Sequence, residues 1–136
     1  MIKYDQQSLQ VMSFFEKVTK SKLKDFFEMD DLLIFVVQPA QLWKAVGKKG
    51  ANVKRLREKF KKNIKIVEYN SDLKTFIQNM IYPLKAKSIA EDDGIIIIET
   101  DDRKTKALLI GRNAQALRGL EKAVKRYFKL DEIKIA

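Results

Sequence analysis

The stretch AVGKKGANVKRLREKF, residues 45–60, places two lysines between two glycines, at the point where an apolar run gives way to a mostly basic one. Behind the second glycine, Val53, Leu56 and Phe60 recur at intervals of three and four residues, which predicts a helix with one apolar side. A short helix is also predicted in front of the first glycine, over residues 40–46. The glycines and lysines therefore form a tight connection between two helices.

A connection of this kind favours the binding of an anion. The first backbone N–H groups of a helix lack intrahelical acceptors, and the helix dipole places partial positive charge there. Gly47 and Gly50 permit positive φ angles and close approach of a ligand, while Lys48 and Lys49 add two charges at the same place. A phosphodiester backbone fits this description. A Gly-x-x-Gly pattern on its own is more often an ordinary helix end, so the interpretation depends on the rest of the chain.

The predicted elements occur twice in the same order: helix, strand, strand, helix, glycine turn, helix, strand. The first half adds a helix over residues 5–20 and strands over 23–28, 32–37 and 64–67. The second half has a helix over 73–81 with Ser71 as N-cap and Pro83 after its end, strands over 84–90, 95–98 and 133–135, and helices over 103–110 and 117–127. A shift of 64 residues places Gly47 on Gly111, which indicates an internal duplication.

The net charge of +10 is concentrated around the two glycine turns. Residues 44–62 contain nine Lys and Arg against one acid, Glu58, and residues 103–129 contain nine against one, Glu121. The remainder of the chain carries more acidic than basic residues. Such segregation favours a polyanion as the ligand.

The composition argues against most catalytic and metal sites. The chain has no cysteine and no histidine, so it can form no disulfide, no thiolate metal site and no histidine base. Three acidic pairs offer oxygen ligands for Mg²⁺, namely Asp30-Asp31, Asp92-Asp93 and Asp101-Asp102. They fall where turns or strand ends are predicted, and Asp is an ordinary residue there. We therefore expect a protein that is not an enzyme and needs no cofactor or metal.

The apolar runs are too short for a membrane protein. No stretch approaches the roughly 18 consecutive apolar residues of a membrane span, and the first ten residues lack the apolar segment of a signal peptide. Neither basic helix carries the large apolar face needed to bind an anionic membrane surface. We expect a cytoplasmic protein with no membrane partner.

The aromatic residues are assigned to packing. The eight phenylalanines lie mostly at core spacing: Phe14, Phe15, Phe26, Phe27, Phe35, Phe60, Phe76 and Phe128. Trp43 shares its helix with Val46 and could support a binding groove, but a partly buried core position is favoured for it.

Residues 32–67, and again 95–135, resemble KH domains, with Gly47-Lys48-Lys49-Gly50 matching the Gly-x-x-Gly loop of that family. With the preceding helix and strand, each half resembles the type II arrangement, α-β-β-α-α-β. Two such domains in direct tandem are similar to the archaeal NusA-like transcription factors. The resemblance implies an α+β fold of two tandem KH type II domains, residues 1–70 and 71–136, each with helices packed on one face of a three-stranded sheet.

The resemblance also implies a function and its residues. KH domains clamp about four single-stranded nucleotides, with the loop backbone against the phosphates and the bases in an apolar groove. The first clamp would consist of Val46, Gly47, Lys48, Lys49, Gly50, Val53, Lys54 and Arg57. The second would consist of Ile110, Gly111, Arg112, Asn113, Ala114, Leu117 and Arg118.

The second copy departs from the family pattern because Ala114 stands where the second glycine belongs. Alanine tolerates positive φ poorly, so a weaker or differently shaped clamp is expected there.

The expected function is therefore single-stranded RNA binding in transcription elongation or termination, with RNA polymerase as a candidate partner. Two alternatives stay open. One is a KH protein of ribosomal or RNA-processing complexes, and the other is an adaptor that binds RNA polymerase through protein contacts. Single-stranded DNA is not distinguished from RNA by these residues. Duplex DNA is disfavoured, because nothing resembles a recognition helix on a helix-turn-helix core.

Overall fold

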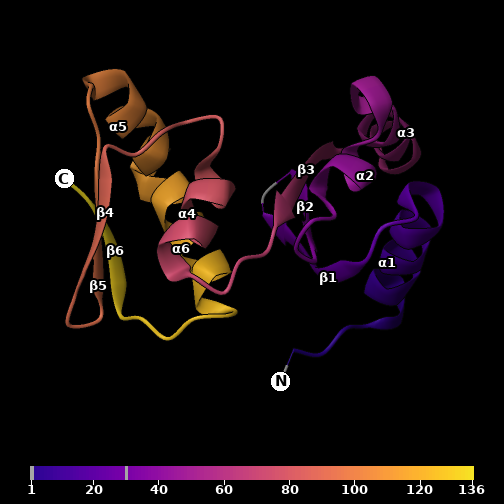
Figure 1. Cartoon of the computed structure of the whole chain (residues 1–136), viewed down its shortest axis with the longest axis horizontal. Helices are drawn as coiled ribbons and strands as arrows, with labels where there is room; N and C mark the ends of the chain where they lie inside the picture. Colours follow the sequence, from indigo (N-terminus) through magenta and orange to yellow (C-terminus); the bar gives the residue numbers. More distant parts are fainter. Residues whose placement is uncertain (1, 30) are drawn as a thin grey trace. The chain divides into compact units, whose positions relative to one another are not determined.

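The computed structural model describes residues 2–29 and 31–136, and it divides the chain into two compact units, Met1–Asn70 and Ser71–Ala136 (Figure 1). Each unit contains one three-stranded sheet accompanied by helices. The predicted α+β class is confirmed at this level.

The first unit has a mixed sheet with helices on one face (Figure 1). Its elements are α1 (Gln6–Thr19), β1 (Leu23–Met29), β2 (Leu32–Val37), α2 (Leu42–Val46), the 3-10 turn η1 (Lys48–Gly50), α3 (Ala51–Phe60) and β3 (Asn63–Glu68). The strand order is β1-β2-β3, with β2 antiparallel to β1 and parallel to β3. The parallel pair requires a crossover, and α2, η1 and α3 provide it.

The second unit repeats this order and pairing. Its elements are α4 (Leu73–Ile81), β4 (Ser88–Asp92), β5 (Ile95–Glu99), α5 (Arg103–Ile110), the 3-10 turn η2 (Arg112–Ala114), α6 (Gln115–Lys125) and β6 (Glu132–Ile135). Strands β4 and β5 are antiparallel, and β5 and β6 are parallel. The helix-turn-helix crossover therefore occurs twice, each time between the central strand and its parallel neighbour.

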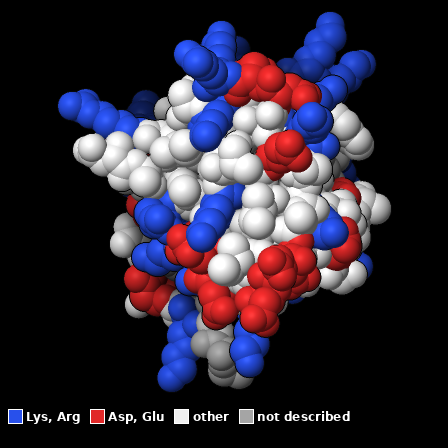
Figure 2. Space-filling view, turned by 90° about the vertical axis from the view of Figure 1, so that its left-hand side faces the viewer, with Lys and Arg blue, Asp and Glu red and all other residues white. Residues whose placement is uncertain are grey.

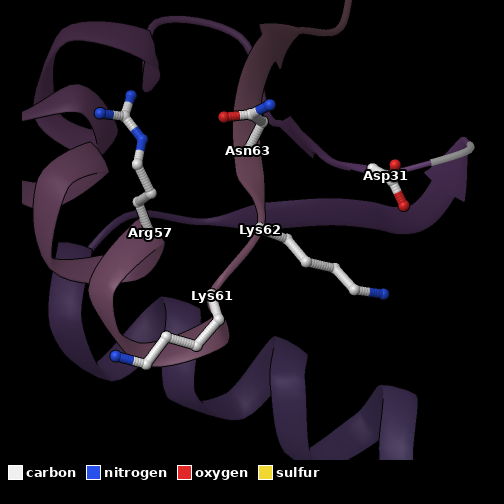
Figure 3. Close-up of a pocket in the computed structure, with 5 residues that line it drawn as sticks. All are labelled: Asp31, Arg57, Lys61, Lys62 and Asn63. Atoms are coloured by element: carbon white, nitrogen blue, oxygen red, sulfur yellow. The ribbon is translucent and has the colours of Figure 1, made fainter.

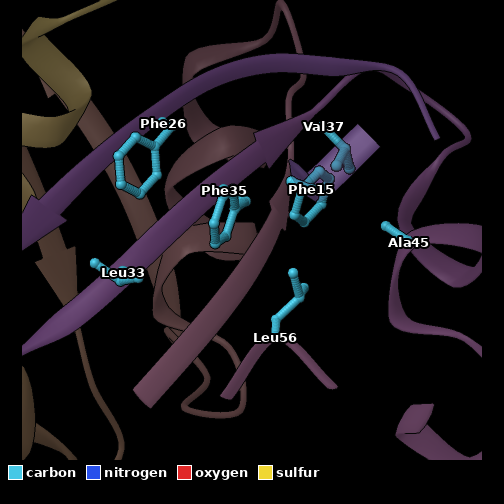
Figure 4. Close-up of a cluster of buried hydrophobic side chains, with 7 residues drawn as sticks. All are labelled: Phe15, Phe26, Leu33, Phe35, Val37, Ala45 and Leu56. Atoms are coloured by element: carbon cyan, nitrogen blue, oxygen red, sulfur yellow. The ribbon is translucent and has the colours of Figure 1, made fainter. Parts of the chain in front are cut away.

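Phe35 of β2 lies at the centre of the first unit's core (Figure 4). Its ring stacks on Phe15 of α1, with 4.3 Å between the ring centroids, and on Phe26 of β1, with 4.9 Å. Ala45 of α2 and Leu56 of α3 complete this cluster, and both are fully buried. The crossover helices are thus fixed to the sheet by the side chains that precede and follow the glycine turn.

The core of the second unit contains isoleucines from its sheet and apolar residues from α4 and α6. Ile96, Ile98 and Ile133 are fully buried in β5 and β6. Phe76 of α4 is also fully buried, and its ring meets the edge of Tyr127 at a centroid distance of 5.3 Å. One side of α6 packs into this core, and its buried residues are Leu117, Leu120, Ala123 and Val124.

Aspartates cap three helices. The carboxylates of Asp5, Asp72 and Asp102 accept hydrogen bonds from the backbone N–H groups of Ser8, Thr75 and Thr105 respectively. Because the ionised carboxylate is the better acceptor, the backbone hydrogen bonds lower the pKa of Asp5 and of Asp102. The pKa of Asp72 is lowered first by the hydrogen bond from the Thr75 hydroxyl and then by that from the Thr75 N–H. The predicted N-cap at Ser71 is wrong by one residue, since Asp72 takes that role. Asp102 belongs to one of the three acidic pairs that were considered as magnesium ligands. Its role as the N-cap of α5 explains an acidic residue at this position.

Several predicted element boundaries differ from those observed, most of them by one or two residues. The helix before the first glycine begins at Leu42 rather than at residue 40, because Ala40 has a positive φ of 67° that does not belong to a helix. The last helix ends at Lys125, and Tyr127 follows in a turn.

The strand expected over residues 84–90 runs over 88–92 instead. The side-chain amide of Gln78 explains this shift, since its nitrogen donates to the Leu84 carbonyl and its oxygen accepts from the Ala86 N–H. The segment before β4 is therefore held by α4 rather than by a neighbouring strand.

None of the helices formed by the described residues is both long and apolar enough to cross a bilayer.

The packing around Phe35 yields a stability prediction. Phe35→Ala should lower the free energy of unfolding by about 3–5 kcal/mol, because it removes stacking with two rings and leaves a cavity. Urea unfolding followed by circular dichroism measures the change. Leu9→Ala is the control, since this α1 side chain is exposed and its loss should change stability by less than about 0.5 kcal/mol. An equal effect of both substitutions would contradict the assignment of Phe35 to the core.

Candidate functional site

The first glycine turn depends on an unusual backbone conformation at Gly47. Its φ of 81° and ψ of 166° lie in a region that is essentially restricted to glycine. A Cβ atom at this position would lie 2.9 Å from the side chain of Asn52. The conformation and the space therefore both require glycine, and only the four loop residues 47–50 separate α2 from α3.

Two left-handed residues follow. Lys49 has φ 55° and ψ 29°, and Gly50 has φ 74° and ψ 20°. Lys48 and Lys49 are exposed, and no side chain caps the start of α3. Backbone N–H groups that turn through left-handed conformations next to an uncapped helix start form a concave surface for an anion.

Asn52 connects the two helices that flank this loop. Its side-chain amide donates a hydrogen bond of 3.2 Å to the carbonyl oxygen of Lys44 in α2. The sequence analysis did not single out Asn52, although Asn is unusual in the first turn of a basic helix unless its side chain has a partner. The hydrogen bond fixes the start of α3 against the end of α2.

The second loop has nearly the same backbone. Gly111 has φ 74° and ψ 174°, Asn113 has φ 55° and ψ 32°, and Ala114 has φ 61° and ψ 21°. The sequence predicted that the loop with Ala114 would bind more weakly or have a different shape. Its backbone does not have a different shape. The loops match because the glycine-only conformation occurs at their first position, where a Cβ on Gly111 would lie 2.7 Å from that of Ala116.

The last loop position is more permissive than the first. A Cβ atom added at Gly50 would meet nothing within 4 Å, so only the left-handed backbone opposes a side chain there. For an L-residue other than glycine, that conformation costs about 1–2 kcal/mol of free energy. Ala114 adopts it, and the shape of the loop is unchanged.

The two loops differ more strongly in charge. The exposed cations of the first site, Lys48, Lys49, Lys54 and Arg57, form no ion pair within the described part of the chain. In α6, Arg118 is paired with Glu121 at 3.1 Å. By the 64-residue shift Glu121 occupies the position of Arg57, so the second site has an acid where the first has a base.

The apolar residues assigned to the two grooves are not equally accessible. Val46 and Val53 are half-buried, and so is Ile110. Leu117 is only 7 % exposed, which places it in the core of the second unit. Beside the first loop, α3 therefore presents an accessible apolar residue, Val53. The corresponding residue of α6 beside the second loop, Leu117, is buried.

The prediction for Trp43 is wrong. Its side chain is 80 % exposed on α2, instead of partly buried in the core. Ala45, one of its neighbours on this five-residue helix, is the residue that enters the core. In so short a helix the apolar pattern does not specify which side chains face inward.

A cavity of about 500 Å³ lies beyond the C-terminal end of α3 (Figure 3). It is lined by Asp31, Arg57, Lys61, Lys62 and Asn63. Lys62 also forms an ion pair of 3.1 Å with Glu28 of β1. Lys61, Lys62 and Asn63 were not among the predicted site residues. Lys61 follows the last residue of α3 and continues the sequence spacing of Lys54 and Arg57.

The two basic sequence windows coincide with the two helix-turn-helix crossovers, from α2 to the end of α3 and from α5 to the turn after α6. On the face shown in Figure 2, Lys and Arg side chains project around the margin. Asp and Glu form separate groups on the same face, the largest of them below its centre. The excess positive charge therefore accompanies the crossovers rather than the whole surface.

Within residues 2–29 and 31–136, no three acidic side chains gather in a way that could hold a metal ion. Asp30, one member of an acidic pair, lies outside the described residues.

Comparison with known proteins identifies the family. The model of the KH domain family matches residues 10–82, which is more than half of the chain. The chain belongs to the KH domain family. The match includes the Gly47–Gly50 loop, and it extends from α1 into the α4 helix of the second unit.

Several archaeal relatives share the sequence. A protein of Methanococcus vannielii named "Probable transcription termination protein NusA" is 31 % identical over 112 residues, which cover 79 % of this chain and 65 % of the relative. One of the same name from Methanocaldococcus jannaschii is 28 % identical over 134 residues, covering 95 % of this chain and 72 % of the relative. This chain thus spans about two thirds of their lengths. The resemblance to archaeal NusA-like KH proteins is confirmed.

A solved structure also matches along nearly the full chain. The structure described as "Crystal structure of APE1850" has a TM-score of 0.77 and 26 % identity, and covers 98 % of this chain and 100 % of that one. The fold of that protein is therefore similar to that of this chain over the residues of both units.

The difference between the two loops at their last position predicts opposite effects of reciprocal substitutions. Gly50→Ala should lower the free energy of unfolding by about 1 kcal/mol, and Ala114→Gly should raise it by about 1 kcal/mol, because each left-handed position favours glycine. Urea unfolding of the two variants measures both changes.

Gly111→Ala provides the comparison at the first loop position. It should destabilise the protein by more than Gly50→Ala does, since a Cβ there also approaches the backbone of Ala116. Equal losses for these two substitutions would contradict the distinction between the first and last loop positions.

Proposed function

We propose that the chain consists of two tandem KH type II domains, which correspond to the two units, and that it binds single-stranded RNA through their glycine loops. The observation that carries this proposal is the Gly47–Gly50 loop: a left-handed turn beside an uncapped helix start, with two exposed lysines. The repeated element order and the matching backbone of the Gly111–Ala114 loop support the same role for the second unit.

The site suits a single strand better than a duplex. Its positive groups surround a short loop and one side of α3 instead of an extended recognition surface for a groove. A phosphate of the strand would meet the loop N–H groups and Lys48 and Lys49, and adjoining phosphates would meet Lys54 and Arg57. The half-buried Val46 and Val53 would form the apolar wall for the bases. This is a binding role that requires no catalytic group.

The first domain is proposed to be the stronger RNA site. Both loops have the same backbone, so the difference comes from charge: Lys49 is replaced by Asn113, and Arg57 by Glu121. In addition, Arg118 forms an ion pair with Glu121, so a phosphate must compete with the Glu121 carboxylate to bind Arg118. Weaker binding by the second loop follows from these side chains more than from Ala114.

The biological role is proposed to be that of a NusA-like factor in transcription elongation or termination, with RNA polymerase as a partner. The names of the archaeal relatives support this assignment. The acidic remainder of the chain offers a surface of opposite charge for a protein partner.

Removal of the loop charges tests the clamp. Lys48→Ala with Lys49→Ala should weaken binding of short single-stranded RNAs of every sequence and reduce the slope of log affinity against log salt by about 1.4, because two phosphate contacts are lost. Fluorescence anisotropy of labelled RNA over a range of salt concentrations measures both effects.

Arg112→Ala with Asn113→Ala is the matched variant in the second loop, and it should reduce the slope by about 0.7 or less, since it removes one cation. Unchanged affinity and slope in the Lys48/Lys49 variant would contradict the proposed clamp.

Charge reversal tests whether the side of α3 that carries Arg57 contacts the RNA. Arg57→Glu introduces the acid found in the second domain and should weaken RNA binding about tenfold at low salt. Arg55→Glu makes the same change in net charge on another side of the helix. Arg55 shares that side with Lys59. The Nζ atom of Lys59 lies 5.3 Å from the centre of the Phe14 ring of α1.

The Arg55 variant should change affinity by less than about threefold, because only the general field of the protein is altered. Equal losses for Arg57→Glu and Arg55→Glu would show that net charge, rather than a positioned contact, accounts for binding.

A further inference from the structure

Trp43 is the single tryptophan of the chain, and its side chain is the most exposed of the large apolar ones in the described residues, at 80 %. An indole ring can remove a large apolar area from water, so leaving it exposed forgoes stabilisation that a core position would supply. Single exposed apolar residues are common on protein surfaces. The position of Trp43 is what sets it apart.

Trp43 lies one helical turn before the loop. Its carbonyl oxygen accepts the hydrogen bond of the Gly47 N–H, at 3.0 Å, so the two residues lie on one side of α2. The hydrogen bond between Asn52 and the Lys44 carbonyl connects the next residue of α2 to α3. The backbone that carries the indole is thus fixed relative to the loop and to both of its helices.

The surroundings of Trp43 are positively charged. Lys44 and Lys48 are exposed, and neither forms an ion pair within the described part of the chain. An exposed aromatic side chain beside unpaired cations matches the chemistry of single-stranded nucleic acid, in which flat bases alternate with phosphates. The same charges favour a nucleic acid over an apolar protein surface.

We propose that Trp43 stacks on an unpaired base of the RNA whose phosphates are held by the Gly47–Gly50 loop. This inference rests on the proposed RNA-binding function and adds a base contact to it, outside the apolar wall of Val46 and Val53. Stacking on a ring face is tolerant of sequence, because every base has such a face. The contact therefore strengthens binding without selecting one base by hydrogen bonds.

The contact belongs to the first domain alone. By the 64-residue shift the position of Trp43 is taken by Ala107, which has no ring. Leu108 is 52 % exposed on α5, but it corresponds to Lys44 rather than to Trp43. Stacking thus adds to the charge difference that makes the first domain the stronger site.

Intrinsic fluorescence tests the proposal directly, because all tryptophan emission of the protein comes from Trp43. Binding of a short single-stranded RNA should quench this emission and protect the indole from acrylamide, a neutral quencher. An abasic strand with the same phosphates should bind the loop and leave the emission unchanged.

The affinity of variants gives a second readout. Trp43→Ala should weaken RNA binding by roughly 5-fold or more, as expected for loss of a stacked base, while Trp43→Phe should retain most of the affinity. Leu108→Ala removes a large exposed apolar side chain at the corresponding helix of the second unit and should bind RNA as the unaltered protein does. Circular dichroism confirms that each variant is folded.

The possible outcomes separate this inference from the proposed function. If the unaltered protein binds RNA but its emission and acrylamide quenching do not change, or if Trp43→Ala binds with full affinity, the stacking proposal is wrong and the RNA-binding function stands. Such a result would leave a protein contact as the role of Trp43. If the unaltered protein binds no RNA at all, the proposed function itself is contradicted.

Discussion

The backbone conformation at Gly47, repeated at Gly111, is the constraint on which the rest of the structure depends. Its φ and ψ are accessible to glycine and strained for every other residue, and neighbouring atoms leave no room for a side chain at either position. This turn allows α3 to start after a connection of only four residues, 47–50, so both helices can pack on one face of the sheet. The same turn leaves the start of α3 without a side-chain cap, and the feature that shapes the fold is therefore also the basis of the proposed anion site.

Since the backbone of the two loops is the same, side chains decide how each loop is used. The first has four cations at the loop and along α3 that form no ion pair among residues 2–29 and 31–136, together with an exposed indole on α2. The second has an acid at the position of Arg57, and this acid pairs with Arg118 and also accepts a hydrogen bond from the Ile133 N–H at 2.9 Å. Glu121 thus joins α6 to β6, which favours structural support over phosphate binding. On one repeated backbone arrangement, the side chains thus support two proposed sites of unequal strength.

Much of the fold could be predicted because strong local patterns specify it. The helix over residues 103–110 was predicted with the observed bounds, since Asp102 caps it and Gly111 ends it. Two of the errors arose where a nonlocal contact or a choice between two equivalent residues decided the outcome. The start of β4 depends on the amide of Gln78, which no local pattern reveals. Ser71 and Asp72 are both good capping residues, and the hydrogen bonds to Thr75 select the second.

The site was less predictable than the fold. The loop residues follow from sequence spacing, but the exposure of Trp43, the brace from Asn52 and the pairing of Arg118 depend on which side of a helix meets its neighbours. The central claim is that the loop amides of the first unit hold the phosphates of single-stranded RNA. Amide chemical shifts during titration with a short single-stranded RNA test it most directly. The account predicts that the largest changes occur at residues 47–52, with smaller ones at 111–116. Changes confined to other parts of the chain, with both loops unaffected, would contradict it.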